Sequence, residues 1–109
     1  MTWESALTRL VPDLVAIYGT HLDRVVLFGS VARGTQTEES DIDIALFLRP
    51  GVTAEMEDQA TALAAELGLA CNRVLSVVSI DSDRFAEWKD VLPFYQNVQK
   101  DGVVLWQAA

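Results

Sequence analysis

The chain has 109 residues, of which 50% are hydrophobic and 22% are charged, values that exclude a disordered chain and predict a single globular domain over residues 1–109. Its formal net charge is −8, and because an acidic surface repels the phosphate backbone, this charge argues against nucleic-acid binding and favours a basic protein partner. The lone Cys71 excludes an intrachain disulfide, and neither a signal peptide nor an apolar run of membrane length is evident, so we expect a cytoplasmic protein.

The first predicted element is a helix that Thr2 caps and Gly19 ends. Pro12 predicts a kink or a restart within it, because proline lacks the N–H that a helix interior uses. The apolar residues that follow at helical spacing are Trp3, Leu7, Leu10, Leu14 and Ile17.

Two strands follow, at residues 24–28 and 41–48. The first leads directly into a glycine turn at Gly29-Ser30, and residues 35–40 form a polar loop before the second. The 12 residues between the strands leave little room for a full helix.

The second half alternates helices and strands. We expect a helix that Thr53 caps and Gly68 stops, a strand at residues 73–80 and a last strand at residues 103–106. The intervening segment reads as helical in pieces that break at Pro93. This element order predicts an α+β fold with a mixed sheet.

Asp41 and Asp43 are the strongest candidates for a metal-binding or catalytic role. Positions i and i+2 of a strand point to the same face, so the two carboxylates converge. Alone they would repel each other, whereas a divalent cation such as magnesium, which prefers oxygen ligands, relieves the repulsion. We therefore expect a metal site at these residues, suited to two magnesium ions and a nucleotide.

The glycine turn, which ten residues separate from Asp41, supplies the phosphate-binding part. Gly29 lets phosphate approach the backbone closely, and Ser30 adds a hydroxyl donor. A short helix beginning near Ser30 would also favour an anion. Arg33 is placed to reach the phosphates or to brace the loop, and Ser40 completes the set of candidate nucleotide-binding residues.

Residues 27–34 and 40–43 together (Leu-Phe-Gly-Ser-Val-Ala-Arg-Gly, then Ser-Asp-Ile-Asp) resemble the signature of the DNA polymerase β-like nucleotidyltransferase superfamily. The short chain is similar to its minimal nucleotidyltransferases (MNT), many of which are antitoxins paired with HEPN-domain RNase toxins. The resemblance implies a short mixed sheet with helices packed mainly on one face. It also implies magnesium at Asp41 and Asp43, phosphates held at Gly29 and Ser30, and transfer of AMP from ATP to a hydroxyl of the toxin.

The sequence departs from this family in one respect. Active members usually carry a third carboxylate on a neighbouring strand, yet residues 73–80 contain only Ser76 and Ser79 as candidates. Asp81 and Asp83 follow the strand and would have to bend back. The gap supports an alternative, a catalytically weak protein that neutralises a partner by binding it. Transfer to a small molecule such as an aminoglycoside is a further alternative. The preferred base, the acceptor and the homo- or hetero-oligomeric state stay open.

Overall fold

The computed structural model describes residues 1–35, 37 and 39–109, so positions 36 and 38 of the expected polar loop lie outside the described residues. In chain order its elements are α1 (Trp3–Tyr18), η1 (Gly19–His21), β1 (Leu22–Phe28), α2 (Gly29–Arg33), β2 (Ile42–Leu48), α3 (Ala54–Cys71), β3 (Leu75–Asp81), α4 (Ser82–Trp88), α5 (Pro93–Asp101) and β4 (Val103–Gln107).

The sheet is mixed, as expected for an α+β fold. Its strand order is β3-β2-β1-β4, with β1 antiparallel to both β2 and β4, and β2 parallel to β3. Parallel neighbours need a crossover connection, and α3 provides it between β2 and β3. The antiparallel pair β1 and β2 needs none, so α2 and the loop after it are enough.

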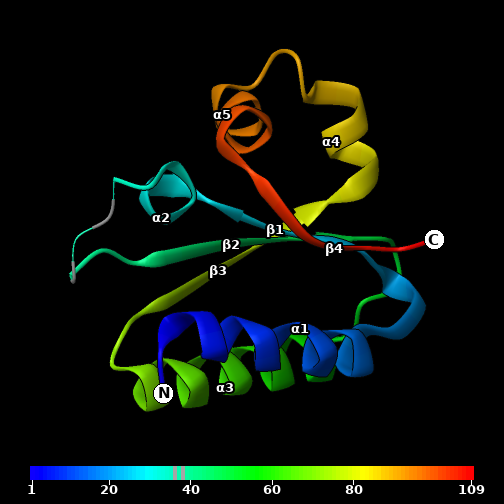
Figure 1. Ribbon diagram of the computed structural model, residues 1–109. Coiled ribbons are helices and arrows are strands. Elements are labelled where there is room, and N and C mark those ends of the chain that lie inside the picture. Colours follow the sequence, from blue (N-terminus) through cyan, green and yellow to red (C-terminus); the bar gives the residue numbers. More distant parts are fainter. Residues whose placement is uncertain (36, 38) are drawn as a thin grey trace.

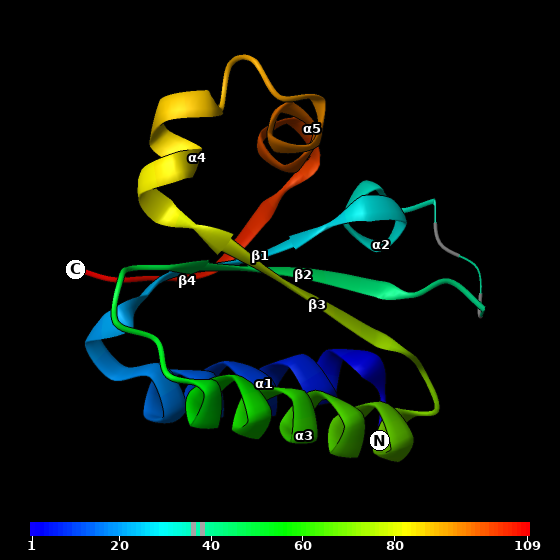
Figure 2. The ribbon, with the colours of Figure 1, turned by 180° about the vertical axis from the view of Figure 1, so that it is seen from behind.

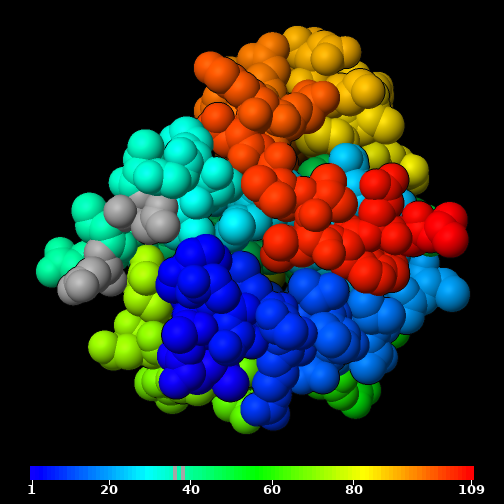
Figure 3. Space-filling view, viewed as in Figure 1, coloured from blue at the N-terminus to red at the C-terminus, as the bar shows by residue number. Residues whose placement is uncertain are grey.

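The helices cover both faces of this sheet, whereas the family resemblance implied that they pack mainly on one (Figures 1 and 2). The two longest, α1 and α3, lie side by side on one face, while α2, α4 and α5 lie over the other (Figures 1 and 2). Each face has its own buried cluster. β4 crosses the front of the molecule between α1 and α5 (Figure 3) and forms one edge of the sheet.

α1 forms as one continuous helix. Thr2 caps it by accepting a hydrogen bond from the Ser5 N–H, and Gly19 ends it at φ +56°, both as predicted. The predicted restart at Pro12 is wrong, because the helix runs through this proline. Leu10 and Leu14 are fully buried on either side of Pro12, and this packing offsets the lost backbone hydrogen bond.

α3 begins after Thr53, whose side chain accepts from the Met56 N–H, but it does not stop at Gly68 as predicted. It continues to Cys71 and ends where Asn72 adopts the left-handed conformation at φ +54°. A Cβ at Gly68 would lie only 2.7 Å from the carbonyl oxygen of Arg73. This glycine therefore permits close packing of the chain that leads into β3.

The helical segment between β3 and β4 breaks as the sequence predicts. α4 ends at Trp88, and Pro93 is the first residue of α5, where its missing N–H leaves no intrahelical bond unmade. Within residues 1–35, 37 and 39–109, no helix combines the length and the apolar character that a membrane span requires.

Candidate functional site at the start of β2

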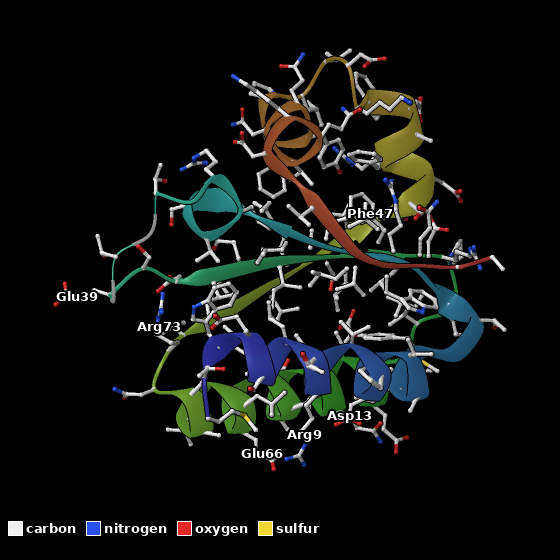
Figure 4. The ribbon with its side chains drawn as sticks, viewed as in Figure 1. Arg9, Asp13, Glu39, Phe47, Glu66 and Arg73 are labelled. Carbon is white, nitrogen blue, oxygen red and sulfur yellow. The ribbon has the colours of Figure 1, made fainter. Side chains whose placement is uncertain are left out.

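Asp43 lies on the sheet face that α4 and α5 cover. Along β2, Ile42 and Ile44 are buried in the cluster on the α1 and α3 side, whereas Ala45 and Phe47 belong to the opposite cluster. Figure 4 shows Phe47 on the side of α4 and α5. Since side chains alternate along a strand, Asp43 shares the face of Phe47, and Asp41, which directly precedes the strand, lies on the same side.

Gly29 lies directly against the Asp43 carboxylate. The residue before it, Phe28, ends β1 in an extended conformation, and Gly29 turns the chain at φ +76° into the short helix α2. A Cβ at this position would overlap the Asp43 carboxylate. Glycine is therefore required twice here, once by the left-handed backbone and once by the space that the carboxylate occupies.

The carboxylates of Asp41 and Asp43 are crowded together at this site. Burial raises the pKa of the Asp43 carboxyl above its ordinary value, and the nearby charge of Asp41 raises it further, while Arg33 lowers it. Among the described residues neither aspartate takes part in an ion pair or a side-chain hydrogen bond. Two crowded carboxylates with unused oxygens are a donor set that suits a hard cation such as magnesium.

Arg33 and Ser40 have structural contacts in addition to their predicted roles. The Arg33 guanidinium donates to the Asp101 carboxylate at 3.2 Å and so ties α2 to α5. The Ser40 hydroxyl accepts from the Thr37 N–H at 2.9 Å and stabilises the turn before Asp41. Ser30 is the second residue of α2, beside Gly29. The turn, the two aspartates and Arg33 thus lie close together in the fold.

Arg73 is a residue at this site that the sequence did not single out. Its guanidinium donates to the carbonyl of Ser40 at 2.8 Å and to that of Thr37 at 3.2 Å. Figure 4 shows it beside the loop that carries Glu39. These bonds fix the chain immediately before Asp41. The only signal in the sequence was a basic residue at the start of the third predicted strand.

A groove of about 690 Å³ lies behind this arginine, between α3 and the start of β3. Its walls include Ala64, Gly68 and Leu75, of which Ala64 and Leu75 belong to the buried cluster on the α1 and α3 side. Its other walls include Ser40 and Arg73, so the groove lies on the α1 and α3 side of the sheet and borders the chain that precedes Asp41.

The sequence matches the family described as "Polymerase beta, Nucleotidyltransferase" over residues 14–108. The chain belongs to this nucleotidyltransferase family. A protein of Methanocaldococcus jannaschii that is provisionally named a protein adenylyltransferase is 33% identical over 106 residues, which are 97% of this chain and 100% of that protein.

Two solved structures show the same fold. A chain of a toxin–antitoxin crystal structure with AMP-PNP has a TM-score of 0.60 and 24% identity, over 92% of this chain and 73% of that one. A chain from the structure of tri-AMPylated Shewanella oneidensis HEPN toxin in complex with MNT antitoxin has a TM-score of 0.56 and 20% identity, over 96% and 72%. The α+β fold of this nucleotidyltransferase is thus that of the minimal nucleotidyltransferases.

The strand that neighbours the two aspartates of this nucleotidyltransferase presents a serine where a third carboxylate would be useful. In the parallel pairing of β2 with β3, Asp43 lies opposite Ser76. The buried side chain of Ile80 points to the α4 and α5 face, and Ser76, four residues earlier on the same strand, shares that face.

The other two candidates for a third carboxylate lie elsewhere. Asp81 pairs with Leu48, five residues beyond Asp43 and so about 17 Å away along the strand. It accepts a hydrogen bond from the Arg84 N–H and caps α4, the helix that contains Asp83. Across residues 1–35, 37 and 39–109, no group of three acidic, histidine or cysteine side chains is placed to hold a metal ion.

Proposed function

We propose that this protein is a magnesium-dependent nucleotidyltransferase that moves AMP from ATP to a hydroxyl of a partner protein, and that it acts as the antitoxin of a HEPN-type RNase toxin. The observation that carries the proposal is the Asp43 carboxylate against the side-chain-free backbone of Gly29, with the charge of Asp41 close by. Charged oxygens next to an open backbone turn suit a polyphosphate that arrives with its counter-ions.

In this proposal Asp41 and Asp43 would hold two magnesium ions, which would supply positive charge to neutralise the phosphates. Gly29 contributes backbone at close range, Ser30 donates its hydroxyl to phosphate oxygens, and Arg33 adds positive charge. Ser40 contributes to nucleotide binding through the turn that precedes Asp41. The acceptor hydroxyl releases its proton to water as its oxygen bonds to the α-phosphorus, the bond from that phosphorus to the bridging oxygen breaks, and pyrophosphate leaves. The chain's contribution is positioning.

Support for a protein acceptor comes from charge and from similarity. With a net charge of −8 the surface favours a basic protein over nucleic acid. The relative from M. jannaschii is named a protein adenylyltransferase, and the S. oneidensis complex pairs an MNT antitoxin with an AMP-modified HEPN toxin. We place the reaction in the cytoplasm, where ATP and such a toxin would meet.

The test uses ATP labelled at the α-phosphate, magnesium and a HEPN-domain protein encoded by the neighbouring gene. We expect label to appear on the partner, to require magnesium and to be lost with Asp41→Asn/Asp43→Asn. If the wild-type protein binds the partner and ATP yet transfers no label, transfer of AMP is rejected and the binding alternative is favoured.

That alternative, a catalytically weak protein that neutralises its partner by covering it, is favoured by one observation, the serine opposite Asp43. Ser76→Asp would place a third carboxylate beside the other two. If catalysis is weak because this ligand is missing, the substitution is expected to accelerate label transfer, with Ser79→Asp, three residues further along β3, as its control. Neutralisation of the toxin by a protein that never transfers label, before or after Ser76→Asp, would establish the binding role.

A further inference from the structure

Phe94 exposes an aromatic ring near the candidate site. It is the second residue of α5, and the residue is 42% exposed. Its ring stands edge-on to that of Phe28, with the ring centroids 5.7 Å apart and an angle of 81° between the planes. A large apolar side chain that stays this exposed while a neighbouring ring orients it is free to contact a ligand.

Phe28 connects this ring to the aspartates. It is the last residue of β1, and in the antiparallel pairing with β2 it lies opposite Asp43. Its side chain packs on the cluster below α4 and α5, the face that Asp43 shares. Paired Cα atoms lie about 5 Å apart, so the Phe94 ring lies on the order of 10 Å from the Asp43 carboxylate.

The orientation of α5 places Phe94 on the side that faces α2. Residues seven apart lie on one face of a helix, so Phe94 and Asp101 share a face. Asp101 binds Arg33 of α2 at 3.2 Å. The face that carries Phe94 is therefore turned toward the helix whose first residue, Gly29, touches Asp43.

We propose that Phe94 is the platform on which the base of the nucleotide stacks. The inference rests on the proposed function, since it takes the phosphates to lie at Gly29, Asp41 and Asp43. The ribose then spans the distance between these phosphates and the Phe94 ring. Every nucleobase offers a flat π-face, so a lone aromatic platform binds nucleobases as a class and discriminates weakly among them.

The experiment compares magnesium–ATP with magnesium–tripolyphosphate, which has the phosphates but no base, by calorimetric titration. Phe94→Ala is expected to weaken ATP binding roughly tenfold and to leave tripolyphosphate binding unchanged, because stacking acts on the base alone. Phe94→Trp is expected to retain ATP affinity. Trp88→Ala removes a ring of similar exposure, 41%, from α4 and is expected to change neither titration.

Phe94→Leu keeps an apolar side chain against Phe28 and guards against a folding defect in the alanine variant. It should melt at the wild-type temperature and still lose ATP affinity. The inference is overturned if Phe94→Leu binds ATP like the wild type, if both probes weaken equally, or if the wild-type protein binds the two probes equally well. Failure of the wild-type protein to bind either probe would instead reject the proposed function.

Discussion

Carboxylates lie at both ends of β2, those at the closing end on the paired strands β1 and β3, but the two groups are used differently. At the closing end, Asp23 accepts hydrogen bonds from Arg49 and from Ser82, each at 2.9 Å, and Asp81 caps α4. At the starting end, Asp41 and Asp43 have no such partners among the described residues. Acidic side chains with partners stabilise a fold, whereas crowded ones without partners oppose it unless a ligand neutralises them.

The largest effect is expected when the two carboxylates at the starting end of β2 are removed. Asp41→Asn/Asp43→Asn is expected to weaken magnesium–ATP binding roughly 100-fold, because each lost charge-assisted contact is worth about 1.5 kcal/mol or more. Asp23→Asn, at the closing end, is expected to leave the dissociation constant unchanged. Calorimetric titration measures both, and equal affinities in the wild-type protein and the double variant would reject the site.

The next effect tests the contact between Gly29 and Asp43. Gly29 and Gly34 have nearly the same φ, +76° and +74°, so alanine at either costs about 1–2 kcal/mol of stability. The added Cβ meets Asp43 at Gly29, whereas at Gly34 it has no neighbour within 4 Å among the residues that the structure describes. Gly29→Ala is expected to lower ATP affinity by roughly tenfold, and Gly34→Ala to leave it near wild type. Similar losses of affinity in both variants would contradict the account.

A smaller effect is expected from the arginines that brace the two ends. Arg73 binds the carbonyls of Thr37 and Ser40, and Arg49 binds the carbonyl of Thr20 together with Asp23. Arg73→Ala is expected to weaken ATP binding roughly fivefold by loosening the chain before Asp41, with partial rescue by lysine. Arg49→Ala should lower the melting temperature without changing affinity. If Arg73→Ala lowered the melting temperature but left ATP affinity unchanged, Arg73 would contribute to stability alone.

The smallest expected effect is a change in the melting temperature of the metal-free protein when Asp43 is replaced. Burial and Asp41 raise the pKa of Asp43, so the folded state favours its protonated form. The protonated carboxyl of Asp43 therefore stabilises the folded state at low pH. This stabilisation is lost as the pH rises through the raised pKa. At neutral pH in EDTA, Asp43→Asn should therefore raise the melting temperature, with the gain vanishing near about pH 3, below the ordinary carboxyl pKa.

Under the same conditions, Asp23→Asn is expected to change the melting temperature in the opposite direction. It removes an acceptor from Arg49 and Ser82 and should lower the melting temperature by about 2–5 °C. Thermal melts in EDTA measure both variants. A fall in melting temperature for both would mean that Asp43 has a structural partner.

The sequence predicted what depends on local pattern. The alternation along β2, the glycine turn into a short helix and the caps at Thr2 and Thr53 all follow from neighbouring residues. The pairing of Asp43 with Ser76 does not, because it depends on how two strands more than 30 residues apart align. The same alignment places Asp81 beside the closing end of β2, away from Asp43.

Tertiary packing also explains the remaining misses. Gly68 reads as a helix stop from sequence, yet it is a helical glycine that the nearby Arg73 backbone requires. Pro12 lies within a helix that buried leucines hold in place. The fold alone brings Arg73 to the carbonyl of Ser40, directly before Asp41, and the ring of Phe94 to that of Phe28, and no spacing in the sequence reveals either contact.

The most direct test of the central claim is an NMR titration of the isotope-labelled protein with magnesium–ATP. The account predicts that amide shifts change most at Gly29, Ser30, Asp41 and Asp43, only when magnesium is present, and that those of Asp23 and Asp81 stay in place. Shifts that gather at the closing end of β2, or binding that ignores magnesium, would contradict it.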